Sequence, residues 1–206
     1  MNKIFIDVGA NRGQSIEQFL DHWEGAADFK IYSFECSPQL KNILTKTAEK
    51  NKSRCKSIKV ITKGAWDKNG KQTFYDEGNE SSSLLSEKTT VNPITVDVID
   101  LSQWIQAKFE PEDYIILKID AEGAEYNIFN KFTKDGTFAY IDKLYGELHS
   151  RKCGKGYKDD IKIIKNIEKE NLKLHIWDAS NDLKIRSDYY TPEWLEATYE
   201  RKGWKK

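Results

Sequence analysis

The segment IDVGANRGQS (6–15) decides the fold, because it runs from an apolar strand through a glycine turn into a helix. The run KIFIDV (3–8) is short, β-branched and apolar, which is typical of a buried parallel strand. After Gly13, apolar residues recur at helical spacing as far as Trp23. A strand, a glycine turn and a helix in this order are typical of the opening of a doubly wound α/β sheet.

The same alternation continues along the chain. Apolar runs at 29–35, 57–66, 114–120 and 140–149 predict further strands, with helical patterns between most of them. After the second strand, Ser37 and Pro38 predict an N-cap and the first position of a helix. Alternating strands and helices favour right-handed crossovers, so we expect an α/β fold with a mostly parallel sheet.

We expect one domain over residues 1–206, because no linker and no internal repeat divides the sequence. Residues 1–150 are expected to form a cofactor-binding core. The polar loop 76–92 is long for a compact domain, and such loops are usually functional or mobile. We expect this loop and residues 151–206 to lie on the substrate side, with LKLHIWD and LKIRSDYY (172–178 and 183–190) forming a closing hairpin.

The composition excludes several classes of function. Lys plus Arg and Asp plus Glu are both 33, so no global field attracts the chain to nucleic acid or to a membrane surface. No apolar run is long enough to be a signal peptide or to span a bilayer. Cys36, Cys55 and Cys153 are widely spaced and odd in number, which argues against a disulfide framework. We expect a soluble, cytoplasmic protein, and the sequence gives no indication of its oligomeric state.

The glycine turn favours one kind of nucleotide over another. Gly9 and Gly13 lack the middle glycine of G-x-G-x-x-G, which lets a backbone approach a pyrophosphate. Asp7 would also face a phosphate with like charge. The same carboxylate suits an ammonium, a sulfonium or hydroxyl groups, and the helix N-terminus can take a carboxylate. S-adenosylmethionine (SAM) carries all of these groups, and we expect it to be the cofactor.

Glu35 ends the second predicted strand, which supports a nucleoside ligand. An ionised carboxylate offers about four acceptor sites and can bind both ribose hydroxyls. This acid alone does not separate NAD from SAM, because both contain that ribose. The glycine spacing and Asp7 favour SAM, and an NAD-type oxidoreductase is the first alternative.

Several motifs in order along residues 3–150 resemble the FkbM-like SAM-dependent methyltransferases. They are IDVGANRGQS, FECSPQ, GAWDKNG followed by SSSL, VDVIDLSQWI, LKIDAEGAEYNIF and GELH. The pair formed by DVGAN.G and KID.EGAE is the specific part of this resemblance. It implies a class I methyltransferase fold, with a mostly parallel seven-stranded sheet whose last strand is antiparallel. It also implies transfer of a methyl group, usually to a hydroxyl oxygen.

The resemblance also implies a set of cofactor-binding residues. These residues would form the first loop, bind the ribose, border the adenine, close over the cofactor and lie near the methyl donor. In chain order they are Asp7, Gly9, Ala10, Asn11, Gly13, Glu35, Cys36, Ala65, Trp66, Ser83 and Asp120. Trp66 stands where the family often carries a smaller residue. The chain after Ser150 is outside the resemblance and is expected to hold substrate determinants.

A second polar cluster follows the strands at 114–120 and 140–149. Asp120 and Glu122 begin a helix, where acids favour the helix dipole, and they also lie where open α/β sheets bind ligands. If the two strands are neighbours, His149 joins them, and its unperturbed pKa near neutrality suits a general base. We take His149, Asp120 and Glu122 as the candidate catalytic residues.

The same cluster could bind a metal ion through Asp120, Glu147 and His149, because carboxylates and imidazole are suitable metal ligands. No ligand-spaced motif such as HExxH occurs, so we expect no metal. The favoured function is a SAM-dependent O-methyltransferase acting on a small-molecule or carbohydrate hydroxyl. A second alternative is a binding module that holds SAM without turnover.

Overall fold

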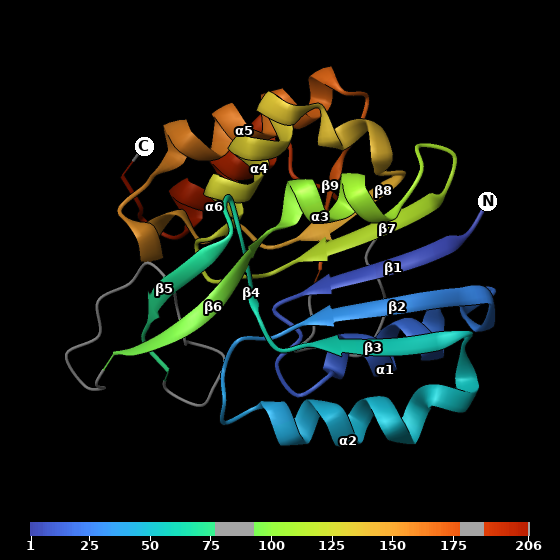
Figure 1. The fold of residues 1–206 in the computed structure, drawn as a ribbon. Coiled ribbons are helices and arrows are strands. Elements are labelled where there is room, and N and C mark those ends of the chain that lie inside the picture. Colours follow the sequence, from blue (N-terminus) through green and yellow to red (C-terminus); the bar gives the residue numbers. More distant parts are fainter. Residues whose placement is uncertain (77–92, 178–187, 206) are drawn as a thin grey trace.

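The central sheet of the computed structural model contains six parallel strands, in the order β3-β2-β1-β7-β8-β9 (Figure 1). The structure describes residues 1–76, 93–177 and 188–205. The strands are β1 Lys3–Val8, β2 Phe29–Phe34, β3 Ser57–Ile61, β7 Tyr114–Ile119, β8 Lys143–Gly146 and β9 Leu174–Ile176. The α/β class and the parallel sheet predicted from the sequence are confirmed.

Helices cover both faces of this sheet. On one face, α1 (Gln14–His22) and α2 (Lys41–Asn51) pack against strand residues such as Phe5 and Ile116. The opposite face is covered by α3 Leu101–Lys108, α4 Glu125–Asp135 and α5 Tyr157–Lys169. Short 3-10 turns occur at Ala26–Asp28, Lys52–Arg54, Thr137–Tyr140 and Ser150–Cys153.

A second, three-stranded sheet lies beyond the carboxyl ends of the central strands, at the left of Figure 1. Its strands, in the spatial order β4-β6-β5, are β4 Gly64–Trp66, β5 Gly70–Phe74 and β6 Ile94–Asp100. The single strand predicted at 57–66 is therefore wrong. The chain leaves the central sheet after Ile61, and β4 instead pairs with β6, which buries Ala65 and Trp66.

The predicted start of the second helix is also corrected. Ser37 does not cap it, because the Ser37 hydroxyl donates to the Asp76 carboxylate at 2.8 and 2.9 Å. Residues 37–40 form a turn in which Leu40 N–H donates to the Ser37 carbonyl, and α2 begins at Lys41. Because the Ser37 hydroxyl is hydrogen-bonded to Asp76, which follows β5, it cannot cap the helix.

The antiparallel seventh strand is reduced to an isolated bridge between Tyr189 and His175. Hydrogen bonds on both sides of this bridge show a short antiparallel run at 188–190, which stops where Thr191 caps α6 (Pro192–Arg201). This helix was missed from the sequence, although Thr191 followed by Pro192 is a strong helix start. Within the described ranges, every helix falls short of the length and apolar character that a bilayer crossing requires.

Candidate functional site

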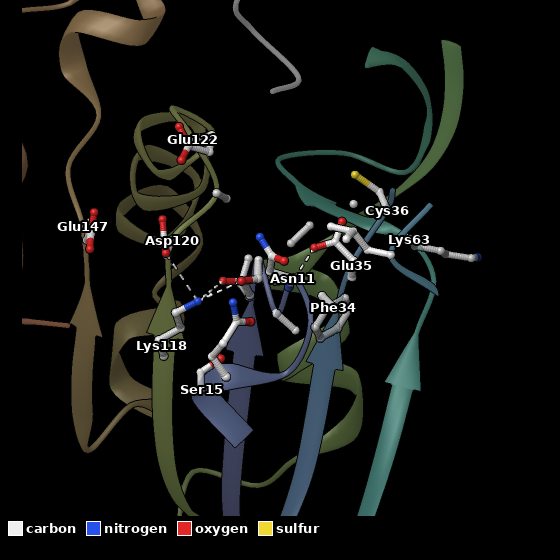
Figure 2. A pocket seen from close by; sticks show the side chains of 18 of the residues that line it. Asn11, Ser15, Phe34, Glu35, Cys36, Lys63, Lys118, Asp120, Glu122 and Glu147 are labelled. Carbon is white, nitrogen blue, oxygen red and sulfur yellow. Dashed lines mark hydrogen bonds and ion pairs between the residues drawn. The ribbon is translucent and has the colours of Figure 1, made fainter. Parts of the chain in front are cut away.

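A pocket opens at the carboxyl edge of the central sheet, where the tips of β1, β2, β7 and β8 meet the second sheet (Figure 2). Open α/β sheets bind ligands at this edge. Its wall is formed by Val8, Gly9, Ala10, Asn11, Gln14, Ser15, Phe34, Glu35, Cys36, Leu40, Lys63, Gly64, Ala65, Phe74, Lys118, Asp120, Ala121, Glu122 and Glu147.

The loop after β1 is pressed against the end of β7 at Gly9. This residue has φ +73°, and an added Cβ would lie 1.8 Å from the Asp120 carbonyl oxygen. The N–H groups of Gly9 and Ala10 both donate to the Phe34 carbonyl, so the loop also joins the tip of β2. Only glycine allows this approach of backbone to backbone.

Asp7 lies beneath the pocket and does not form part of its wall. Its carboxylate is fully buried, accepts from the Ser15 hydroxyl at 2.7 Å and lies 3.3 Å from the Lys118 ammonium. Lys118 offsets the charge of Asp7, so a ligand in the pocket would meet this ion pair and not a bare carboxylate. The expectation that this carboxylate faces the ligand is corrected, and the buried ion pair is the physical reason.

Glu35 extends from the end of β2 into the pocket and is held by the backbone. Its two carboxylate oxygens accept from Asn11 N–H at 2.9 Å and from Ser37 N–H at 2.8 Å. Burial raises the pKa of Glu35, although these N–H groups oppose the change. Beside it, the Asn11 Oδ1 atom is buried without a hydrogen-bond partner among the described residues. A ligand with hydroxyl groups would satisfy both side chains.

The wall near the second sheet is less polar. Ala65, Phe74 and Leu40 lie here with Cys36, whose thiol has its pKa raised well above the usual value, first by burial and then by the charge of Glu35. A neutral thiol and apolar side chains suit the flat face of a nucleobase. Lys63 adds a cation to this side of the wall.

At the other side of the pocket, carboxylates surround the imidazole of His149. Its Nε2 atom lies 3.8 Å from both Asp120 Oδ1 and Glu122 Oε1, and 3.4 Å from Glu147 Oε2. Its Nδ1 atom is 2.9 Å from the buried Glu125, which also accepts from the N–H groups of Ala121 and Gly123. Lys152 pairs with Glu122 from the outer side.

This setting changes the protonation of His149. Burial lowers the pKa of the imidazole, but hydrogen bonds to Glu125 and Glu147 and the charges of Glu125 and Asp120 outweigh it and raise the pKa to about 11. The ring is therefore an imidazolium at neutral pH and has no free lone pair to accept a proton. This differs from the expected pKa near neutrality, and the ring of carboxylates is the cause.

The cluster also contains residues that could hold a metal ion. Ligand atoms of Asp120, Glu122 and His149 all lie within 4.8 Å of one another. Three cations of the chain, Lys118, Lys152 and the His149 imidazolium, lie against the same carboxylates.

The structure brings most of the predicted residues together. The pocket wall includes Gly9, Ala10, Asn11, Glu35, Cys36, Ala65, Asp120 and Glu122. Ser83 lies outside the described residues, as does most of the loop 76–92.

Among the predicted residues that are not in the wall, Gly13 (φ +92°) forms the turn before α1, where an added Cβ would lie 2.7 Å from Thr47. Trp66 is 5% exposed and packs in the core between the two sheets. His149 is not in the wall, but it lies against Asp120, Glu122 and Glu147, which are.

Lys118 was missed, although a charged residue inside the apolar run YIILKI is an unusual signal. It is 2% exposed and lies between Asp7 and Asp120. Burial lowers the pKa of Lys118, but the charges of Asp7 and Asp120 outweigh it, so the pKa is raised and the ammonium stays charged.

A protein family and a solved structure match this chain. A crystal structure of methyltransferase FkbM from Methylobacillus flagellatus KT is similar, with a TM-score of 0.47 and 14% identity, over 86% of this chain and 33% of that one. The chain thus spans about a third of the length of that protein. No curated protein matches. The methyltransferase FkbM domain family matches residues 7–174. The chain therefore belongs to the FkbM methyltransferase domain family.

Proposed function

We propose that this protein uses SAM to methylate a hydroxyl oxygen of a small molecule or a sugar. The observation that carries the proposal is Glu35, whose carboxylate is fixed by two backbone N–H groups. Beside it lies Asn11 Oδ1, which no described residue hydrogen-bonds. These two acceptors, Glu35 after β2 and Asn11 in the loop after β1, fit the hydroxyls of a ribose. Membership of a methyltransferase family supports the rest of the assignment.

The residues of the pocket divide between the parts of SAM by their chemistry. Glu35 and Asn11 would hold the ribose, while Ala65 and Cys36 would border the adenine. The N–H groups at the start of α1, where Gly13 provides no side-chain cap, suit a carboxylate, and Asp120 suits an ammonium or a sulfonium. When bound, SAM supplies a methyl group on a positively charged sulfur.

The chain itself must position the acceptor hydroxyl and take its proton. Glu122 is the better candidate for the proton, because it lines the pocket and burial raises its pKa despite His149 and Lys152. His149 acts as a fixed imidazolium that orients Asp120 and Glu122. Orientation of the reactants can supply up to roughly 7–11 kcal/mol, so most of the rate is expected from positioning.

Calorimetry with S-adenosylhomocysteine and with NAD tests the cofactor. We expect S-adenosylhomocysteine to bind and NAD not to bind. Binding of NAD alone would support the oxidoreductase and overturn the proposal. Transfer of labelled methyl groups to a panel of sugars and small alcohols tests turnover, and cofactor binding without any transfer would support the inactive binding module.

The Glu122→Gln variant tests the proton acceptor. We expect kcat to fall by about 10²-fold or more, which is the usual contribution of a general base, with the affinity for S-adenosylhomocysteine unchanged. Glu168→Gln, which changes an acid on the distant helix α5, is the matched control. If kcat of Glu122→Gln equals that of the wild type on a proven acceptor, Glu122 does not take the proton.

A further inference from the structure

We propose that Lys118 is a positioning residue for the amino-acid head of the cofactor, acting through the Gly9 carbonyl and the Asp120 carboxylate that it holds. This inference rests on the proposed function and assigns a role to a buried cation that the proposed chemistry does not use. Lys118 is the fifth residue of β7 and extends toward the carboxyl end of the sheet (Figure 2).

Burying Lys118 is costly unless its charge is matched. The residue is 2% exposed and lies directly opposite Asp7 in the β1–β7 register. Their side chains therefore share one face of the sheet, beneath the start of α1, where the Ser15 hydroxyl also binds Asp7. A chain of polar contacts thus runs from α1 through β1 to β7.

Two backbone carbonyls accept hydrogen bonds from the ammonium of Lys118, and two carboxylates lie beside it as ion pairs. It donates to the Gly9 carbonyl at 2.9 Å and to the Val8 carbonyl at 3.3 Å, and it lies 3.3 Å from Asp7 Oδ1. Asp120 Oδ2, at 3.7 Å, is held by charge. The hydrogen bonds of Lys118 go to the loop after β1, and its ion pairs go to Asp7 and Asp120, so we infer that its influence on a ligand passes through Asp120 and the loop at Gly9.

Lys118 lies at the end of the pocket where the amino-acid head of the cofactor is expected. The ribose acceptors Glu35 and Asn11 lie at the tips of β2 and β1, and Asp120 follows β7 on the opposite side of β1. A nucleoside held at Glu35 that extends along this edge brings its amino-acid head to Asp120. This head carries an ammonium, which suits Asp120, and a carboxylate, which the acids at this end would repel.

Lys118 offsets that repulsion. Its ammonium lies 3.3 Å from Asp7 Oδ1 and 3.7 Å from Asp120 Oδ2, and the charges of these acids and of Glu147 raise the pKa of Lys118. It therefore reduces the negative potential where the carboxylate of the head must lie, and it keeps Asp120 directed along the edge. The adenosine half is held by Glu35 and by apolar wall residues on the other side of β1.

Two ligands separate the halves of the cofactor: S-adenosylhomocysteine, which has the amino-acid head, and 5′-methylthioadenosine, which lacks it. The variant is the double change Asp7→Asn with Lys118→Met, which removes both buried charges and leaves neither unpaired. We expect its affinity for S-adenosylhomocysteine to fall by about tenfold or more, because Asp120 then lacks the cation that holds it, with less than about a threefold change for methylthioadenosine.

Lys63→Met is the matched control, because Lys63 also lines the pocket but lies on the adenine side. We expect it to change both affinities by the same factor. If the double variant does not fold, Lys118→Arg replaces it. This change keeps the charge but substitutes a planar fork for a point donor, and it should give the same selective loss at about threefold.

The outcomes test the role of Lys118 separately from the proposed function. Selective loss of S-adenosylhomocysteine in the Lys118 variant supports the inference. An equal loss of both ligands, or no loss of either, would overturn it while the wild-type affinity upholds the proposed function. A wild-type protein that binds neither ligand would overturn both.

Discussion

Glu35, at the end of β2, is held by the backbone, whereas Asp120, at the end of β7, is surrounded by charged side chains. Glu35 accepts from two backbone N–H groups at 2.8 and 2.9 Å. Asp120 lies 3.7 Å from Lys118 and 3.8 Å from His149. The first carboxylate depends on the path of the chain, and the second depends on a network of ion pairs.

The difference predicts how the two ends respond to mutation. A carboxylate fixed by local backbone keeps its place when distant side chains change. A carboxylate in a charge network moves when one of its partners is removed, and removal leaves the remaining charges unbalanced in a low-dielectric setting. We therefore expect changes at the β7 end to affect both stability and binding, and changes of Glu35 itself to affect mainly binding.

The largest expected effect comes from Lys118→Met alone. This change leaves Asp7 buried without its counter-charge, and breaking a buried pair in this way typically costs about 3–5 kcal/mol. Urea unfolding measures the loss. The double variant with Asp7→Asn should recover most of the stability, since neither charge then remains unpaired. A double variant as unstable as the single one would show that the ion pair is not the cause.

Next in size is Gly9→Ala. The added Cβ would lie 1.8 Å from the Asp120 carbonyl at φ +73°, so we expect a loss of about 2–4 kcal/mol from strain and overpacking. Gly154→Ala is the matched control, with φ +69° and no atom within 4 Å of the added Cβ. It should cost only about 1 kcal/mol. Equal losses in thermal unfolding would refute the close contact between the β1 loop and β7.

A smaller effect is expected for Glu35→Gln, and it concerns binding. Removing the charge weakens the hydrogen bonds to a ribose, so affinity should fall by about 10–100-fold. S-adenosylhomocysteine and methylthioadenosine should lose affinity equally, because both contain that ribose. Calorimetry tests this. A loss confined to S-adenosylhomocysteine would mean that Glu35 contacts the amino-acid head instead.

The smallest effect is the pH dependence that His149 contributes. Because its folded pKa, at about 11, lies above the ordinary value of 6.5, its stabilisation is fully present below pH 6.5 and is lost as the pH rises toward 11. The stability difference between wild type and His149→Gln should therefore decline across that window. Urea unfolding at several pH values measures it, and a difference that increases with pH would contradict the imidazolium.

The elements that depend on local pattern were predicted well from the sequence. β1, β2 and β7 are apolar runs that end at glycine or at an acid, and the pocket residues Gly9, Asn11, Glu35 and Asp120 follow directly from those ends. The carboxyl ends of parallel strands meet at one edge, so finding the strands was enough to find the pocket.

What the sequence did not reveal depends on distant partners. The strand expected at 57–66 is divided because β4 pairs with β6, more than thirty positions later. Asp7 and Lys118 are 111 positions apart, and the charge of either alone suggests an exposed residue. The pKa of His149 is set by Glu125 at the start of α4 and by acids that follow β8 and β7. No local pattern encodes such pairings.

A crystal structure with S-adenosylhomocysteine tests the central claim most directly. We predict the ribose hydroxyls at hydrogen-bond distance, about 2.5–3.0 Å, from the Glu35 carboxylate, with the amino-acid head extending across β1 to Asp120. Adenosine bound away from the tip of β2, or a reversed ligand with its head at Glu35, would contradict the assignment of the site.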